Sequence, residues 1–276
     1  MVTAFVLGGG GVLGAVEVGM LRALLERGIV PDLVLGTSVG ALNGAMVARR
    51  PEPAVVDRLT ELWAATARGR DVYGDRPLRT VRRAVSSGTH IYSSEPLRAR
   101  LEEELGDLRF EDLPVHLEVC AASIERAAEH WFTSGPLVPA ILASAAVPGL
   151  LPPAEVDGEH FLDGGLVNSI PVGRAVELGA TRVFVLQVGR IDRPLRVPTR
   201  PWEVARVSFE VARRHRFTRD MATIPDGVEA YVLPAAGTSP RDDSLLAHRD
   251  FSRVQARIDA TYAASRAYLD AELGPS

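Results

Sequence analysis

The serine best placed for nucleophilic chemistry is Ser38, because the segment Gly36-Thr37-Ser38-Val39-Gly40 matches the pattern G-x-S-x-G. A strand that turns sharply into a helix strains the backbone of such a serine, so its neighbours must lack bulk. This turn would lift the hydroxyl above a sheet, at the positive end of the helix, where the Val39 N–H can polarise a bound carbonyl. The pattern also fits an ordinary turn. It makes Ser38 a candidate nucleophile for acyl transfer.

A serine hydroxyl needs a base, and the chain offers two kinds. Asp163 is followed by Gly164 and Gly165, which would let its carboxylate approach another backbone closely, although Asp-Gly-Gly is also common in plain turns. A histidine oriented by an acid is the other kind, and a Ser-His-Asp triad would use His215 or His248. No histidine sits in a glycine-supported turn, and each one fits a solvated or structurally satisfied position: His90, His116, His130, His160, His215 and His248.

A glycine-rich loop follows the first apolar segment, where Gly9-Gly10-Gly11-Val12-Leu13-Gly14 fits G-x-G-x-x-G. In one interpretation it binds a dinucleotide, but the second strand then needs a terminal carboxylate and instead ends Val34-Leu35-Gly36-Thr37. In another, the N–H groups of the consecutive glycines form an oxyanion hole. A connection without function is the third interpretation, against which stands the entropy cost of four consecutive glycines.

The elements that must position these residues alternate between strand and helix. We expect short strands at 3–7 and 33–35, each followed by a glycine turn and then a helix, the first from Val12 with Gly28 as C-cap and the second at 41–49. This alternation is typical of a mostly parallel sheet flanked by helices, which is an α/β fold.

The rest of the chain continues this pattern. Helices are predicted at 53–66, 96–105, 136–146 (with Ser134 as N-cap), 172–178 (with Gly179 after it), 202–221 and 251–273, and strands at 117–122, 129–132, 182–188 and 228–233. Asp157-Gly158 predicts a hairpin turn between two short β-like runs. The segments 67–94 and 190–201 lack periodicity and are either surface loops without function or candidates for a lid over a site.

Composition limits the classes of protein. The 276 residues, 46% of them hydrophobic, suit one domain over 3–273, because no linker appears at mid-chain. A net charge of −4 implies no attraction to nucleic acid. All basic residues are Arg, which excludes lysine-based mechanisms. Cys120 stands alone in an apolar run, so we expect an inert buried thiol, no intramolecular disulfide and no multi-cysteine metal site.

Targeting signals are not evident either. The apolar N-terminus lacks a basic n-region and carries Glu17, which argues against a signal peptide. No apolar stretch approaches the roughly 20 residues of a membrane span. We therefore expect a cytoplasmic protein, with peripheral contact at a membrane left open.

Together, the three motifs resemble those of the patatin-like phospholipase family. The resemblance consists of a strand, GGG-x-x-G and a helix, then G-T-S-V-G about 25 residues later, then D-G-G more than 100 residues beyond. Residues 142–153 also resemble the Ser/Ala-rich helix and proline loop that precede the family's Asp-Gly motif. The resemblance covers about residues 3–190.

The resemblance implies a three-layer fold and a lipid acyl hydrolase, a phospholipase or carboxylesterase without metal or organic cofactor. It implies a Ser-Asp dyad in which Ser38 is the nucleophile and Asp163 the base. The glycines divide into oxyanion-hole donors, namely Gly9, Gly10 and Gly11, and supporting positions, namely Gly14, Gly36, Gly40, Gly164 and Gly165. The implied partners are a lipid or other ester substrate and a membrane surface in transient contact.

One position departs from the family pattern. Leu13 stands where the family usually has Arg or Lys, which leaves the amide donors in place but bears on whether phospholipid is the substrate. A catalytically inactive protein of the same fold therefore stays open as an alternative, beside the triad hydrolase and the nucleotide-binding module.

Overall fold

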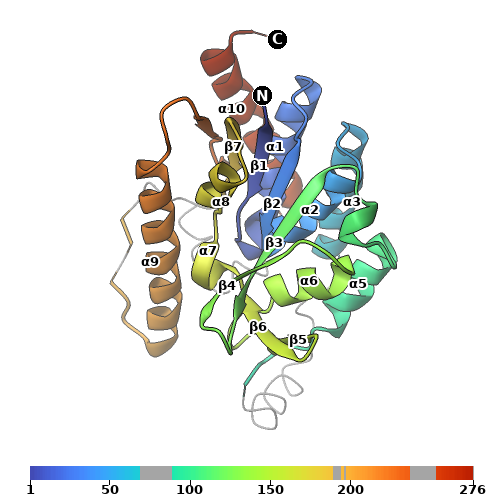
Figure 1. The fold of residues 1–276 in the computed structure, drawn as a ribbon, viewed down its shortest axis with the longest axis vertical. Helices are drawn as coiled ribbons and strands as arrows, with labels where there is room; N and C mark the ends of the chain where they lie inside the picture. The colour runs from blue at the N-terminus through green and yellow to red at the C-terminus, as the bar shows by residue number, and fades with distance from the viewer. Residues whose placement is uncertain (69–88, 189–193, 196, 237–252, 276) are drawn as a thin grey trace.

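One mixed sheet of eight strands runs through the computed structural model, which describes residues 1–68, 89–188, 194–195, 197–236 and 253–275 (Figure 1). The strands are β1 (Thr3–Leu7), β2 (Leu33–Thr37), β3 (His116–Ser123), β4 (Ala128–Phe132), β5 (Ala154–Val156), β6 (Glu159–Asp163), β7 (Arg182–Leu186) and β8 (Glu229–Val232). Their order is β5-β6-β3-β2-β1-β7-β8, with β4 paired to β3.

The sheet is parallel at its centre and antiparallel at one end. β1 pairs in parallel with β2 and β7, β2 with β3, and β7 with β8. β4, β5 and β6 form the antiparallel part. The predicted mostly parallel α/β sheet is thereby confirmed. Every residue of β1 and β2 is buried, as expected for strands covered on both faces.

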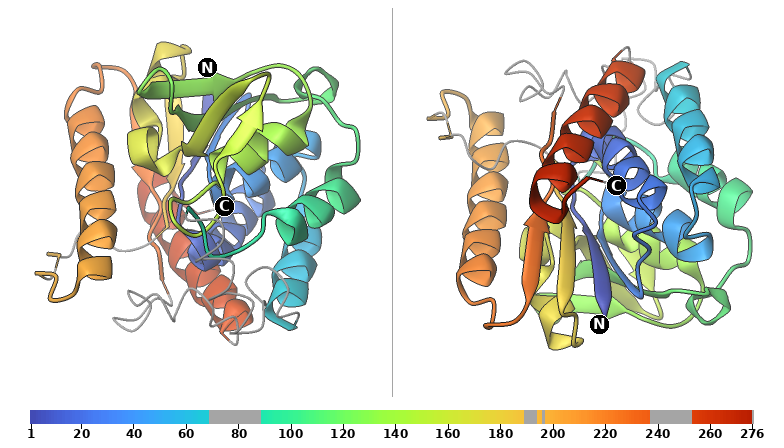
Figure 2. Two further views of the ribbon diagram at one scale, coloured as in Figure 1. Left: turned by 90° about the horizontal axis from the view of Figure 1, so that it is seen from below. Right: turned by 90° about the horizontal axis from the view of Figure 1, so that it is seen from above.

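Helices cover both faces of this sheet. They are α1 (Ala15–Glu26), preceded by the 3₁₀ turn Gly11–Gly14, α2 (Val39–Arg49), α3 (Ala54–Arg68), α5 (Glu95–Leu105), the 3₁₀ turn Phe110–Asp112, α6 (Leu137–Ser144), α7 (Gly165–Asn168), α8 (Val172–Glu177), α9 (Pro201–Ala222) and α10 (Val254–Leu273). In Figure 2, α9 stands on one side of the sheet, and α1 and α10 lie together on the other.

Two hydrophobic cores result, because side chains alternate along each strand. Phe5 and Leu7 of β1 belong to the larger core, which packs against α1, α2 and α10. Ala4 and Val6 point to the other face and pack with residues of α8 and α9, among them Phe217. The three-layer arrangement follows from this division.

Local turn chemistry mostly follows the sequence. Asp157 and Gly158 have φ of 51° and 80° and join β5 to β6 as the predicted hairpin. Gly28 and Gly179 have positive φ directly after their helices. The predicted N-cap Ser134 is wrong.

The start of α6 explains that error. Pro136 occupies the N-cap position, and no side chain caps the helix. The N–H of Leu137 instead donates to the carbonyl oxygen of Leu108, 3.0 Å away. A segment distant in sequence therefore satisfies the donor that the serine was expected to bind.

The candidate lid segment 67–94 lies mostly and the segment 190–201 partly outside the described residues, since 69–88, 189–193 and 196 are not described. Among the helices that are described, none is both long enough and apolar enough to cross a bilayer.

Candidate active site

Two strands meet end to end along one edge of β3. β2 pairs with β3 in parallel up to Thr37, opposite Cys120, and β6 pairs antiparallel to β3 up to Asp163, opposite Ala121. β4 occupies the other edge at both positions. Because β2 and β6 run toward one another, the register places Ser38, the residue after β2, beside Asp163.

The two side chains are in direct contact. The Ser38 hydroxyl donates a hydrogen bond to Oδ2 of Asp163 at 2.7 Å, and the Gly165 N–H donates to Oδ1 at 2.8 Å. Ser38 is 7% exposed and Asp163 is 2% exposed. Both carboxylate oxygens are therefore held, which fixes the carboxylate's orientation toward the serine.

Burial changes the basicity of this carboxylate. It raises the pKa of Asp163 from the usual 3.8 to about 6, and the hydrogen bonds from Ser38 and Gly165 limit the increase. The group remains mostly ionised at neutral pH, yet it holds a proton more strongly than an exposed aspartate does. It therefore suits the role of general base better than an exposed aspartate would.

The turn at Ser38 is strained, as the sequence pattern predicts. Ser38 has φ 57° and ψ −122°, a conformation that residues with a side chain rarely adopt. A Cβ at Gly36 would lie 2.6 Å from Cα of Ala41, and one at Gly40 would lie 2.3 Å from the carbonyl oxygen of Leu7. The flanking glycines are thus required by close backbone contacts.

The glycine loop lies against the serine. A Cβ at Gly9 would lie 3.3 Å from Cβ of Ser38, and Gly11 lines the same pocket as Ser38. The Gly9 N–H, however, donates to the carbonyl oxygen of Ser169 at 3.0 Å, so this donor is already used within the protein. The N–H groups of Gly10 and Gly11 donate to no acceptor among the described residues.

Ser144 is a contact that the sequence pattern did not predict. Its hydroxyl accepts a hydrogen bond from the Ser38 N–H at 2.8 Å and donates to the carbonyl oxygen of Cys120. Its own carbonyl oxygen accepts from the Gly164 N–H at 3.2 Å. One residue at the end of α6 therefore joins the serine turn, β3 and the segment that carries Asp163.

A second buried polar cluster holds the far end of the glycine loop. Asn43 donates through Nδ2 to the carbonyl oxygen of Gly14 at 3.1 Å and to Oε2 of Glu17 at 2.7 Å. Trp63 donates through Nε1 to Oδ1 of Asn43 at 3.3 Å. Burial raises the pKa of Glu17 well above its usual range, which favours the neutral acid. The loop is thereby tied to α2, the helix that follows Ser38.

The described histidines form no hydrogen bond with Ser38 or Asp163. His160 is exposed and pairs with Glu125 at 2.7 Å, and His215 is also exposed. The ring of His130 packs on Phe132 and Phe161, and burial lowers its pKa. His248, the other histidine of the triad alternative, lies outside the described residues.

Two further expectations concern sulfur and metals. Cys120 is fully buried, and burial raises the pKa of its thiol, as predicted for an inert cysteine. In the described ranges, no group of three or more His, Cys, Asp or Glu side chains is arranged to share a metal ion.

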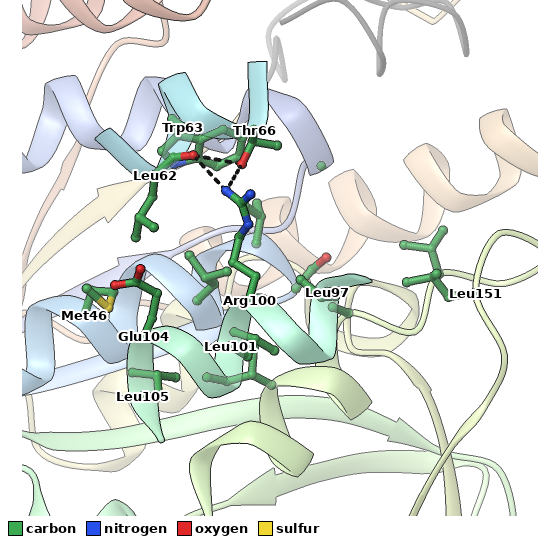
Figure 3. A pocket seen from close by; sticks show the side chains of 17 residues that line it. Met46, Leu62, Trp63, Thr66, Leu97, Arg100, Leu101, Glu104, Leu105 and Leu151 are labelled. Atoms are coloured by element: carbon green, nitrogen blue, oxygen red, sulfur yellow. Dashed lines mark hydrogen bonds between the residues drawn. The ribbon is translucent and has the colours of Figure 1, made fainter. Parts of the chain in front are cut away.

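An apolar pocket opens beside Ser38 (Figure 3). Its wall comes from the glycine loop, α2, α3, α5, α6 and the segment after α6: Gly11, Ser38, Val39, Leu42, Met46, Leu62, Trp63, Thr66, Leu97, Arg100, Leu101, Glu104, Leu105, Ile141, Ala145, Val147 and Leu151. The nucleophile candidate therefore faces a space that suits hydrocarbon.

The chain is similar in sequence to known proteins. The family model described as patatin-like phospholipase matches residues 5–176. The patatin-like phospholipase domain-containing protein ZK370.4 of Caenorhabditis elegans is 34% identical over 68% of this chain and 14% of its own length. Lysophospholipase nte1 of Aspergillus terreus is 30% identical over 68% and 12%, and the uncharacterized NTE family protein Mb1092c of Mycobacterium bovis is 32% identical over 61% and 44%. The chain thus spans less than half the length of these relatives.

Replacing Ser144 by alanine should destabilise the protein by about 1–3 kcal/mol, because the Ser38 N–H and the Cys120 carbonyl lose their partner in a buried site. Urea unfolding would measure the loss. The matched control is Ser265→Ala, since the Ser265 hydroxyl is fully buried but has no partner among the described residues. Equal losses in the two variants would contradict the bridging role of Ser144.

Replacing Asp163 by asparagine should stabilise the fold above pH 6. In the folded state the raised pKa means that ionisation of Asp163 costs stability as the pH rises from 3.8 to about 6. An increase in pKa from 3.8 to about 6 corresponds to about 3 kcal/mol of stability. The asparagine variant should gain this stability at pH 8, and the gain should disappear progressively toward pH 4. Thermal unfolding at several pH values would measure it. The same gain in Asp107→Asn, at an exposed turn, would contradict the explanation.

Proposed function

This chain belongs to the patatin-like phospholipase family, and we propose that it hydrolyses acyl esters of lipids with a Ser-Asp dyad, in which Ser38 is the nucleophile and Asp163 the general base. The observation that carries this proposal is the buried 2.7 Å hydrogen bond from the Ser38 hydroxyl to the Asp163 carboxylate, at the edge of an apolar pocket. The name of the relative lysophospholipase nte1 supports the same class of substrate.

The reaction proceeds in two steps. In the first, Ser38 Oγ attacks the ester carbonyl carbon while Asp163 takes the hydroxyl proton. The tetrahedral intermediate collapses, Asp163 returns that proton to the leaving alcohol, and an acyl-serine remains. In the second step, water attacks the acyl-serine, Asp163 accepts a proton from the water, and Ser38 leaves the carbonyl carbon with that proton as the acid is released.

The negative charge on the carbonyl oxygen needs donors, and the glycine loop is the proposed source. Gly10 and Gly11 are the better candidates, since their N–H groups donate to no described residue and Gly11 lines the pocket beside Ser38. Gly9 is not a donor in this proposal, because its N–H already binds the carbonyl oxygen of Ser169. Its role is to let the loop backbone approach Ser38 closely. One such donor is typically worth about 3 kcal/mol in the transition state.

The position that departs from the family pattern has a packing role. Leu13 is partly buried and packs against the larger hydrophobic core. It supplies no charge for an anionic head group, so we propose lipid acyl esters as the substrate class without assigning a phosphate site to this residue. A single domain over 3–273, a cytoplasmic location and transient membrane contact stay predictions.

The Ser38→Ala variant should lose hydrolysis of p-nitrophenyl esters and covalent labelling by a fluorophosphonate, because it removes the hydroxyl that attacks in the proposed mechanism. The Asp163→Asn variant should fold, and its rate of ester hydrolysis should be about 10²–10⁴-fold lower than that of wild type. Alanine at His130, His160 or His215 should leave the rate within a few-fold of wild type. Hydrolysis that persists in Ser38→Ala, or that disappears in one histidine variant, would contradict the dyad.

The pH dependence should report the base. Asp163 must be ionised to accept the serine proton, and its pKa is about 6. We therefore expect kcat/KM to increase about tenfold per pH unit below 6 and to level off above about 7. Initial rates with a non-ionising short-chain ester between pH 4.5 and 8.5 would measure this profile. A level profile across pH 5–7 would mean that the carboxylate is not the base.

A further inference from the structure

The pocket runs along α2, away from the serine. Ser38, Leu42 and Met46 line it at intervals of four residues, so they lie on one face of the helix and its N-terminal turn. Eight residues at a rise of about 1.5 Å each give a distance of about 12 Å from Ser38 to Met46. The direction of the pocket is thus set by a helix whose first residue follows the proposed nucleophile.

Another part of the wall comes from α5. Leu97, Leu101 and Leu105 face the pocket at intervals of four residues. Arg49, at the end of α2, donates to the carbonyl oxygen of Glu104 at 2.8 Å, so the end of α5 lies beside the end of α2. In Figure 3, Met46, Glu104 and Leu105 gather at one end of the pocket, and Leu97 lies toward the other.

The two charged residues in this wall are both hydrogen-bonded to other groups of the protein. The Glu104 carboxylate accepts hydrogen bonds from Arg58 at 3.0 and 2.5 Å. The Arg100 guanidinium donates to Oγ1 of Thr66 at 2.9 Å and to the carbonyl oxygen of Leu62 at 3.3 Å. Long charged side chains often cover apolar surface with their stems in this way. Because both charges are paired and most of the other lining residues are apolar, the pocket suits methylene groups.

The end of the pocket far from Ser38 is covered. Met46 is 6% exposed and Leu105 is 3% exposed, and the Arg58–Glu104 ion pair lies outside them. An acyl chain that starts at Ser38 and follows α2 would meet the Met46 side chain. Nearer to Ser38 on the same face, Leu42 forms part of the wall.

We propose that this pocket binds the acyl chain of the substrate and that Met46 limits its length, so that the substrates are esters of one medium-chain acyl group. An extended hydrocarbon advances about 1.3 Å per carbon, given C–C bonds of about 1.5 Å, so 12 Å accommodates about nine carbons. The inference rests on the proposed function, since it takes Ser38 as the point where the acyl chain begins.

The test is a chain-length profile of kcat/KM for p-nitrophenyl esters from two to sixteen carbons, each normalised to the acetate and kept below its aggregation limit. Each buried methylene should increase kcat/KM about fourfold, equivalent to about 0.8 kcal/mol. The increase should stop near eight to ten carbons. Met46→Ala should move this limit two to three carbons longer, and Leu42→Phe should move it shorter.

The control is Met20→Ala, which removes another buried methionine, from α1 and outside the pocket, and should leave the limit unchanged. A limit that stays in place in Met46→Ala, or that moves equally in Met20→Ala, would overturn the inference.

A second measurement does not depend on catalysis. Calorimetry of saturated fatty acids with Ser38→Ala should show affinity that increases with chain length up to the same limit, and the Met46→Ala substitution in that background should extend it. If the affinity depends neither on the length of the fatty acid nor on the Met46→Ala substitution, the inference is overturned even if esters are hydrolysed. If instead the binding limit holds and wild type hydrolyses no ester, the proposed function fails and the acyl-binding site stands.

Discussion

The contact on which the site depends is a carboxylate held out of water against a single hydroxyl. Burial of the ionised Asp163 carboxylate costs free energy of folding. Hydrogen bonds from the Ser38 hydroxyl and the Gly165 N–H offset part of this cost. The same burial makes the carboxylate a stronger base. The burial that makes Asp163 a better base therefore also lowers the stability of the fold. The surrounding structure must be rigid enough to hold the ionised carboxylate in this buried position.

That rigidity comes from contacts between segments far apart in the chain. Ser144 connects the serine turn to β3 and to the Asp163 segment, and Asn43 connects α2 to the end of the glycine loop. Both lie in the buried interior, where their hydrogen bonds do not compete with water. Trp63 belongs to the Asn43 cluster and also lines the pocket, so its packing links the loop to the space for the substrate.

The sequence predicted what short-range sterics decide. Glycines on both sides of a serine, a strand before them and a helix after them indicate a strained turn, and the contacts of Gly36 and Gly40 give the reason. The end-to-end meeting of β2 and β6 depends on strand register, which no local pattern encodes. The hydrogen bonds of Ser144 and of the Gly9 N–H also join residues far apart in the chain, so no local pattern predicts them. At the start of α6, the acceptor expected from Ser134 is instead a carbonyl oxygen distant in sequence.

The hydrogen bond between Ser38 and Asp163 spans 125 positions in the chain. During synthesis the ribosome delivers the serine turn early, but β6 has no edge to join until β3 has formed and the hairpin through Asp157 has emerged. A nascent chain that ends before this hairpin has a hydroxyl with no carboxylate beside it. Under the proposed function, such a fragment has the nucleophile without its general base and therefore cannot hydrolyse an ester.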